Sequence, residues 1–321
     1  MAGILKVDKI QEANSGQGVE LSHKLVDTSG NTIISENNGV ATFGSSVAPS
    51  TNYTFRNKII NGNLKSARVI NQRGASSITG ATGYTYDRWY YDGSTYLYQG
   101  IEDLNVNNGT YCVSWVGDNL IAHWALEDDN DTTPPYTAGP DSALTWNQVS
   151  KNSTFTINES PEHGKHLWIR FSLDTGGDFA NLDKVMVEEG TVATPFEHRP
   201  YGVELALCQR YYWRQPRGTS IYEDFILGGT MDQTTWARYP VRFPVEMRAN
   251  PSFSTTASAG SYANLNSGGL RVATSVKEEA GSVNKMSAII EVYSPNLSTN
   301  QATTFRANSS STATFEFSAE L

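Results

Sequence analysis

Alternation of apolar and polar residues is the strongest pattern in the chain, and it predicts β-strands. Within residues 166–173 every second side chain is apolar, which predicts that Leu167, Ile169, Phe171 and Leu173 share one face of a strand. Trp168 and Arg170 fall on the opposite face, because successive side chains of a strand point to opposite sides. Residues 185–187 predict another strand, which is followed by a turn at residues 189–190.

The longest alternation covers residues 237–247, and it predicts a strand that is either bent or at the edge of a sheet. Pro240 and Pro244 fall on the same face, and proline cannot donate a hydrogen bond to a neighbouring strand. Residues 270–276 and 288–292 are predicted to pair with this strand. Residues 313–317 alternate too, and we expect them to close the C-terminal region.

A single segment has the character of a helix. Residues 202–214 contain good helix formers, and Leu205, Cys208 and Tyr212 follow the i, i+3, i+7 spacing of one helical face. The segment lies between two strand-rich regions. It is therefore predicted to be a short connecting helix, in a chain that otherwise resembles a sandwich or jelly roll.

The first fifty residues differ from the rest of the chain. Two short β-prone runs, residues 32–35 and 40–43, flank the sequence Glu36-Asn37-Asn38-Gly39, which is typical of a β-hairpin. A hairpin alone is marginally stable in water, so we expect residues 1–50 to be stabilised by other copies of the chain. Folding back onto the chain's own body is the alternative. Residues 44–52 form a linker of small residues.

These patterns predict an all-β protein. The expected organisation is an N-terminal β-hairpin arm over residues 1–52, a jelly-roll sandwich over residues 53–201, and a short linking helix followed by a second, smaller β-sandwich over residues 202–321.

Composition and charge narrow the function. The chain has 321 residues, of which 24 are Lys or Arg and 33 are Asp or Glu, so its formal net charge is −9. No basic stripe is visible, which argues against nucleic acid as a partner and against an anionic membrane surface. No apolar run is long enough to insert into a membrane, and the N-terminus lacks the apolar core of a signal peptide. The aromatic fraction of 11% is typical of β-rich extracellular or virion proteins.

Groups of residues that could bind a metal or catalyse a reaction give only weak signals in the sequence. Cys112 and Cys208 are far apart and are predicted to be buried reduced thiols. The acidic run at residues 127–131 could hold Ca²⁺, but it lacks the spacing of a calcium loop and is predicted to be hydrated. His163 and His166 have no third ligand nearby. No nucleophile elbow, metalloprotease helix or nucleotide loop is present, so we expect no enzymatic activity, metal or cofactor.

Aromatic residues crowd positions 84–98, and they are the candidate binding residues. Flat Trp and Tyr rings stack on the C–H faces of sugars. Trp89, Tyr90 and Tyr91 are the predicted glycan contacts, with burial in a core or a subunit interface as the alternative. In a continuous strand Tyr84, Tyr86 and Tyr90 would share one face, and Trp89 and Tyr91 the other.

Several motifs resemble those of bacteriophage tail-fibre and minor virion structural proteins. Residues 184–212, which contain Thr194-Pro195-Phe196-Glu197-His198-Arg199-Pro200-Tyr201-Gly202, are similar to a stretch that recurs in such proteins. Residues 59–63, 71–74, 86–90 and 243–251 resemble flanking parts of the same module, and residues 5–11 resemble marine phage fibre proteins. The resemblance implies a galactose-binding-like jelly roll for residues 53–201, a fold shared with carbohydrate-binding modules. The loose acidic loop at residues 127–135 departs from that pattern.

The function implied is that of a virion structural protein, assembled in the host bacterial cytoplasm and extracellular after lysis. We expect a homotrimeric tail fibre or receptor-binding protein, which attaches to the virion tail or capsid through residues 1–50 and adheres to host surface glycans. A purely architectural capsid decoration or collar fibre is the alternative from a different class. A polysaccharide depolymerase is a third, although such enzymes usually carry long repetitive β-helices.

Overall fold

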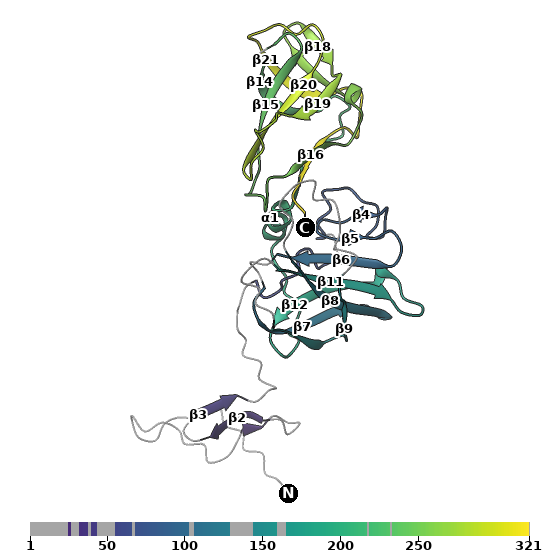
Figure 1. Cartoon of the computed structure of the whole chain (residues 1–321), viewed down its shortest axis with the longest axis vertical. Coiled ribbons are helices and arrows are strands. Elements are labelled where there is room, and N and C mark those ends of the chain that lie inside the picture. The colour runs from purple at the N-terminus through teal and green to yellow at the C-terminus, as the bar shows by residue number, and fades with distance from the viewer. Residues whose placement is uncertain are drawn as a thin grey trace, which may run out of the picture. The chain divides into compact units, whose positions relative to one another are not determined.

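The computed structural model describes residues 55–65, 68–102, 106–128, 144–158, 165–216, 218–231 and 233–320, and the strand backbones at 25–26, 32–37 and 40–43 (Figure 1). The chain divides into two units, Met1–Thr54 and Phe55–Leu321. Nearly all regular structure in the described residues is antiparallel β-sheet, as the alternation predicts.

The N-terminal unit contains a three-stranded sheet in the order β1-β2-β3. Its strands are β1 (Leu25–Val26), β2 (Thr32–Asn37) and β3 (Val40–Phe43). Asn37 pairs with Val40, so β2 and β3 form the hairpin that the Asn-Gly sequence predicts. The predicted linker at residues 44–52 lies outside the described residues.

The second unit begins with a sandwich of two sheets. One sheet has six strands in the order β4-β5-β6-β11-β8-β9, and the other has three in the order β10-β7-β12. The elements are β4 (Gly83–Tyr84), β5 (Tyr90–Tyr91), β6 (Tyr96–Ile101), β7 (Gly109–Val116), β8 (Leu120–Asp128), β9 (Asn147–Val149), β10 (Ser153–Ile157), β11 (Lys165–Leu173), the short 3-10 helix η3 (Phe179–Asn181) and β12 (Asp183–Glu189).

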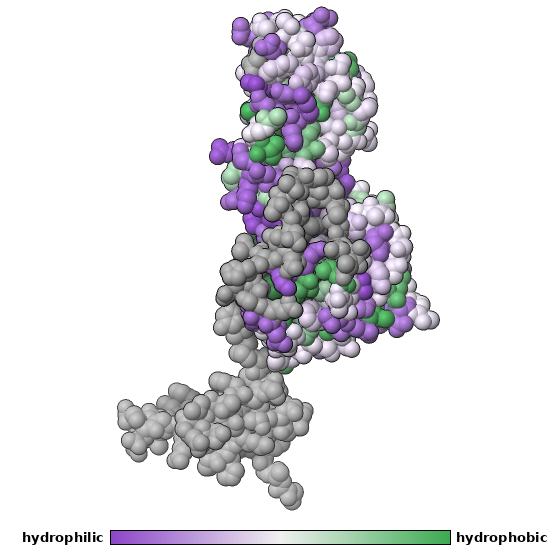
Figure 2. Space-filling view, viewed as in Figure 1, coloured by the Kyte–Doolittle hydropathy of each residue, from purple (hydrophilic) through white to green (hydrophobic). Residues whose placement is uncertain are grey.

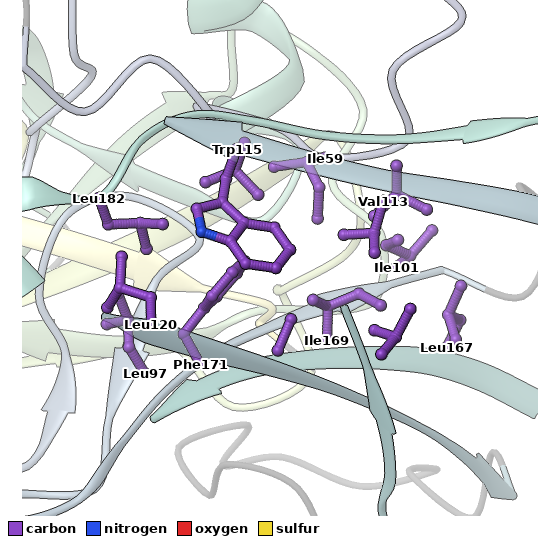
Figure 3. Packing of buried hydrophobic residues seen from close by; sticks show 14 of the residues in the cluster. Ile59, Leu97, Ile101, Val113, Trp115, Leu120, Leu167, Ile169, Phe171 and Leu182 are labelled. Carbon is purple, nitrogen blue, oxygen red and sulfur yellow. The ribbon is translucent and has the colours of Figure 1, made fainter. Parts of the chain in front are cut away.

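Apolar side chains from both sheets fill the space between them (Figure 3). Trp115 of β7 meets Phe171 of β11 edge to face, with ring centroids 5.3 Å apart. The alternation of β11 is confirmed, because Leu167, Ile169 and Phe171 all enter this core. Leu173, which was predicted on the same face, is 43% exposed at the end of the strand. Burial of these side chains is the main stabilising contribution to the sandwich.

The connecting helix α1 (Tyr201–Gln209) is shorter than the predicted segment. Pro200 precedes it, and Cys208 is its buried residue. Residues Tyr212–Arg214 form strand β13 instead of a last helical turn. The run Tyr-Tyr-Trp has a high strand propensity, and it pairs with a C-terminal strand that local spacing does not reveal.

The second sandwich packs a three-stranded sheet, β13-β22-β16, and a seven-stranded sheet, β18-β17-β21-β14-β15-β20-β19, around one apolar cluster. Its other elements are β14 (Asp224–Thr230), β15 (Trp236–Arg242), β16 (Ser252–Thr255), the 3-10 helix η4 (Ala259–Ser261), β17 (Tyr262–Asn266), β18 (Gly269–Val272), β19 (Ser275–Glu278), β20 (Ser287–Tyr293), β21 (Ala302–Ala307) and β22 (Phe315–Ser318). The C-terminal strand was predicted correctly, and residues 288–292, in β20, pair with β15 as predicted. The predicted pairing of residues 270–276 with β15 was wrong, because they divide between β18, which pairs with β17, and β19, which pairs with β20.

Strand β15 was predicted to lie at an edge or to bend, and it lies inside the seven-stranded sheet between β14 and β20. Its pairing with β14 involves only Arg238, opposite Thr230, so Pro240 lies beyond that contact. The strand ends at Arg242, before Pro244. Pro240 is tolerated because β15 has no further register pair with β14 there, and Pro244 is tolerated because it lies beyond the end of the strand.

The two sandwiches meet through a buried polar cluster. Glu320, which is 0% exposed, pairs with Arg88 of the first sandwich and with Arg73, whose Nη2 lies 2.9 Å from the Glu320 Oε1 atom. The Arg88 guanidinium lies over the Tyr211 ring at 3.5 Å from its centroid, and that of Arg73 lies over Tyr212 at 3.6 Å. We call Arg73, Arg88, Tyr211, Tyr212 and Glu320 the junction cluster.

Apolar residues at the surface are scattered. Figure 2 shows small groups of hydrophobic residues among hydrophilic ones on the visible face of the described residues. Among the large apolar residues whose burial is described, Leu227 of β14 has the largest exposed fraction, at 75%. Cys112 and Cys208 are buried free thiols, as predicted.

Candidate functional site

The six-stranded sheet places one residue from each strand in a line across its outer face. Alternation sends the neighbours of these residues into the core and leaves the line on the side away from it. The line, here called the cross-sheet row, consists of Tyr84, Tyr90, Tyr98, Arg170, His123 and Gln148 from β4, β5, β6, β11, β8 and β9 in that order. Figure 1 shows these strands in the same order from top to bottom. Strands lie about 4.8 Å apart, so the row extends over about 24 Å.

One half of the row is aromatic. The rings of Tyr84 and Tyr90 meet edge to face with centroids 5.4 Å apart, and those of Tyr90 and Tyr98 do so at 6.0 Å. Tyr84 and Tyr90 are half-buried, whereas Tyr98 is 8% exposed. Burial and the charge of Asp92 raise the pKa of Tyr98 to about 12, so its hydroxyl is protonated at neutral pH. Half-exposed rings held by their neighbours form a preorganised stacking surface.

Arg170 lies at the centre of the row between two further aromatic rings. Its Cζ atom is 4.0 Å from the ring centroid of Tyr96 and 4.1 Å from that of Trp146. Its Nε atom is buried and has no hydrogen-bond partner. Arg170 forms no ion pair with a carboxylate of the described residues. The rings hold this cation in place, and no described acidic group neutralises it.

The other half of the row is polar. His123 pairs with Arg170 across β8 and β11, and its Nδ1 atom is buried without a hydrogen-bond partner. Burial lowers the pKa of His123, and the charge of Arg170 lowers it further, so the imidazole is neutral at pH 7. Gln148 is exposed, and beside it lies a shallow hollow of about 240 Å³ that Ile121 and Lys151 also line.

Chemically, the row combines ring faces with a fixed cation and hydrogen-bonding groups. Sugars present apolar C–H faces and many hydroxyl groups, so an aromatic surface flanked by polar side chains suits them. The row is long and open. It suits an extended ligand better than a small molecule enclosed in a pocket.

The structure corrects the prediction that Trp89 contacts a ligand. Trp89 is 0% exposed in the core of the first sandwich, and its Nε1 atom donates to the Asn61 carbonyl oxygen at 2.9 Å. The reason is local: residues 84 and 90 belong to separate strands, and between them Arg88 has a φ of 73°, so the chain turns and does not alternate. Tyr86 packs against the core for the same reason.

The other two predicted residues diverge. Tyr91 is half-buried on the core side, with its ring 6.2 Å from that of Phe179. Tyr90 belongs to the cross-sheet row. Tyr84 lies on the same face because it pairs with Tyr90 across β4 and β5, and not through alternation along one strand. Of the three predicted glycan contacts, only Tyr90 therefore lies on the candidate surface.

The weaker candidates acquire structural roles where they are described. His166 is 3% exposed, and a carboxylate oxygen of Glu127 accepts a hydrogen bond from Trp168 Nε1. Residues 129–135 and His163 lie outside the described residues. Among the residues that the structure describes, no three or more His, Cys, Asp or Glu side chains gather as metal ligands, and no helix is long and apolar enough to cross a membrane.

The motifs that resemble phage proteins lie mostly around the junction and meet the row at one end, where Tyr90 belongs to residues 86–90 and Arg73 lies 5.1 Å from the Tyr84 ring centroid. Asn61 is 1% exposed, and its side chain bonds to the backbone of Ile70 and Asp87. A Cβ atom on Gly62 would lie 2.3 Å from the Val185 carbonyl oxygen, so only glycine fits there. Glu204 of α1 pairs with Arg199 at 3.3 Å. These residues build the scaffold.

Most residues of the row could not be predicted from residue spacing along the sequence. Arg170 was placed correctly on the polar face of its strand, but nothing in the sequence shows that His123 and Tyr98 flank it. Trp146 and Gln148 reach the site from β9 and the segment before it, and a short strand carries almost no periodic signal. The cluster of tyrosines at residues 84–98 was the one available signal.

Comparisons with known proteins identify no family. No family model matches the chain, and no curated protein matches it. Among solved structures, a point mutant of oxalate decarboxylase from Bacillus subtilis aligns with 75% of this chain and 74% of its own, at 9% identity and a TM-score of 0.11. So low a score carries no argument about fold or function.

Proposed function

We propose that this protein is a bacteriophage virion component that adheres to glycans on the host surface through the cross-sheet row. The observation that supports binding is the row itself, in which Tyr90 and Arg170 are half-buried on an outer sheet face, with the half-buried Trp146 stacked on Arg170 beside it. The resemblance of residues 184–212 to phage structural proteins supports the virion assignment.

Stacking on exposed rings gives weak binding at each site, because the energy of one ring contact is about 0.5–1.5 kcal/mol beyond its buried area. A virion compensates by presenting several copies. Linked sites gain avidity of about 10²–10⁴ where the geometry lets them bind together. The proposed assembly is a homotrimer.

The N-terminal arm, residues 1–54, is the proposed element for trimerisation and attachment to the tail or capsid. Its strands are two, six and four residues long, and so small a sheet gains little stability alone. We expect the full chain to have a trimeric mass by light scattering and a chain beginning at Phe55 to be monomeric. A trimer that persists without the arm contradicts this part of the proposal.

The binding face is tested with the full chain on a glycan array. We expect Tyr90→Ala and Trp146→Ala to reduce binding at least tenfold with little change in melting temperature, because both side chains are half-buried on the outer face. Trp236→Ala is the matched control, since Trp236 is also half-buried but lies on β15 of the second sandwich. Binding that survives both Tyr90→Ala and Trp146→Ala excludes this face.

Two further measurements separate the alternatives. Adsorption of the purified protein to host cells supports receptor binding, and its absence supports a purely architectural role. Release of reducing sugar from host polysaccharide indicates a depolymerase. Mass spectrometry of purified phage particles tests the virion assignment, which fails if the protein is absent from them.

A further inference from the structure

We propose that the glycan bound by the cross-sheet row is acidic, and that its negative group sits on Arg170. This inference rests on the proposed function, because it specifies the class of glycan that the same face takes. The inference follows from a comparison of Arg170 with the other described arginines that stack on aromatic rings, namely whether each one also pairs with a carboxylate.

Six described arginines stack on an aromatic ring, and five of them also pair with a carboxylate. The five pairs are Arg73 and Arg88 with Glu320, Arg199 with Glu204, Arg238 with Glu279, and Arg306 with Asp224. Arg170 is the exception among the described residues, although it stacks on two rings at 4.0 and 4.1 Å. No carboxylate within the described part of the chain neutralises its positive charge, which is thus offered to an external anion.

Two acidic side chains of the described residues in this part of the sheet are committed elsewhere. The Asp92 Oδ1 atom accepts hydrogen bonds from the N–H groups of Ser94, Thr95 and Tyr96 at 2.8, 2.8 and 3.0 Å. Glu127, on the same face of the sheet, accepts from Trp168 Nε1. These bonds hold the two acidic side chains in place, so neither is free to turn toward Arg170.

The surroundings favour an anion that is part of a sugar. A guanidinium held between Tyr96 and Trp146 needs little ordering before it binds, and it pairs with carboxylate or sulfate oxygens through strong charge-assisted hydrogen bonds. The row continues to either side of Arg170, with rings toward Tyr90 and hydrogen-bonding groups toward His123. An acidic sugar within a longer glycan can pair with the guanidinium of Arg170 while its neighbouring sugars contact the rings and hydrogen-bonding groups on either side.

The test compares charged and neutral forms of the same sugar by titration calorimetry on the full chain. The probes are an oligogalacturonate, its methyl ester, and a sulfated galactan oligosaccharide of similar length. We expect the two charged probes to bind at least tenfold more tightly than the ester, with the difference falling as salt is added. A preference for only one charged probe identifies carboxylate or sulfate as the group recognised.

Substitutions assign the preference to a residue. We expect Arg170→Gln to abolish the difference between the charged probes and the ester, and Arg170→Lys to retain part of it. Arg238→Gln is the matched control, because Arg238 lies 4.7 Å from the ring of Trp236 but pairs with Glu279; its preference should be unchanged. Melting temperatures show whether each variant is folded, and the lysine variant keeps the test valid if the glutamine variant is not.

The outcomes are distinguishable. Equal binding of charged and neutral probes, or a preference that Arg170→Gln leaves intact, overturns this inference while the proposed glycan binding stands. Failure of every probe here and of the glycan array overturns both. A change in the mass of the assembly on Arg170→Gln would mean that the face contacts another copy of the chain, and it would overturn the inference too.

Discussion

The junction cluster and the cross-sheet row use the same arrangement, an arginine stacked on aromatic rings, with opposite outcomes for the charge. At the junction Arg88 lies 3.5 Å from the Tyr211 ring centroid and pairs with Glu320, and both charged side chains are at most 1% exposed. On the outer face Arg170 lies between Tyr96 and Trp146, is half-buried, and pairs with no described carboxylate.

The two sites differ in whether a described carboxylate neutralises the charge of the arginine. Burial alone would lower the pKa of Arg88, but the charge of Glu320 raises it above its ordinary value, so the arginine stays charged inside the protein. A buried charge that is paired with a buried partner serves the folded structure and is not offered to a ligand. An arginine that is held by rings but left without an acidic partner is available for binding. Stacking alone does not distinguish the two roles; the presence of the carboxylate does.

Glu320→Gln is the strongest test of the junction. The substitution keeps the shape of the side chain but leaves Arg88 and Arg73 without their counter-charge. We expect it to lower the free energy of unfolding by about 3–5 kcal/mol, the cost of an uncompensated buried charge. Urea denaturation followed by tryptophan fluorescence measures this.

Glu189→Gln is the control for Glu320→Gln. Glu189 pairs with Lys58 at 3.0 Å, but its side chain is 50% exposed. We expect a loss of less than about 1 kcal/mol, because water screens an exposed pair. Equal effects of the two substitutions would show that burial does not set the strength of the junction.

The pH dependence of stability tests a carboxyl group next to the junction. Burial raises the pKa of Asp87 to about 6, although Arg73 and Gln72 favour its charged form. Its pKa in the unfolded chain is about 3.9. The native state therefore binds a proton that the unfolded state lacks between these values, and the contribution of Asp87 to stability falls as pH rises from about 4 to 6.

Asp87→Asn isolates this contribution. Between pH 4 and pH 7 we expect the wild type to lose about 2–3 kcal/mol of unfolding free energy relative to the variant, a shift of about two pKa units. The comparison is needed because Glu102 has a lowered pKa, which acts in the opposite direction. If the unfolding free energies of the wild type and the variant change in parallel with pH, the raised pKa of Asp87 is contradicted. A carbon NMR titration of the Asp87 carboxyl group measures this pKa directly.

A substitution on the outer face is expected to affect stability much less than one at the junction. Arg170→Gln removes two ring contacts but breaks no ion pair with a described residue, so we expect a loss of about 1 kcal/mol. Arg88→Gln removes the buried partner of Glu320 and should lower the free energy of unfolding by about 3–5 kcal/mol. Thermal unfolding of the two variants side by side gives the comparison. Similar losses would mean that Arg170 is structural and would weaken its assignment to a ligand.

Strand-scale features could be predicted because they depend on near neighbours in the chain. The alternation around Ile169 predicts both its burial and the outward position of Arg170, and the Asn-Gly sequence predicts the hairpin of β2 and β3. Prediction failed where local pattern and tertiary pairing compete. Residues 212–214 continue a helical spacing, yet they pair with β22, and Trp89 follows a turn that reverses its face.

The amino-acid sequence by itself determined the all-β class, the strand faces and the aromatic enrichment at residues 84–98. These follow from side-chain period and propensity, which act over a few residues. Only the tertiary structure decided that β6, β11 and β8 are neighbours, and hence that Tyr98, Arg170 and His123 form one row. It also decided that Glu320, 232 positions further along the chain, neutralises Arg88, whereas none of the described carboxylates pairs with Arg170. Contacts between residues distant in sequence depend on how whole sheets pair and pack, and no local period records that choice.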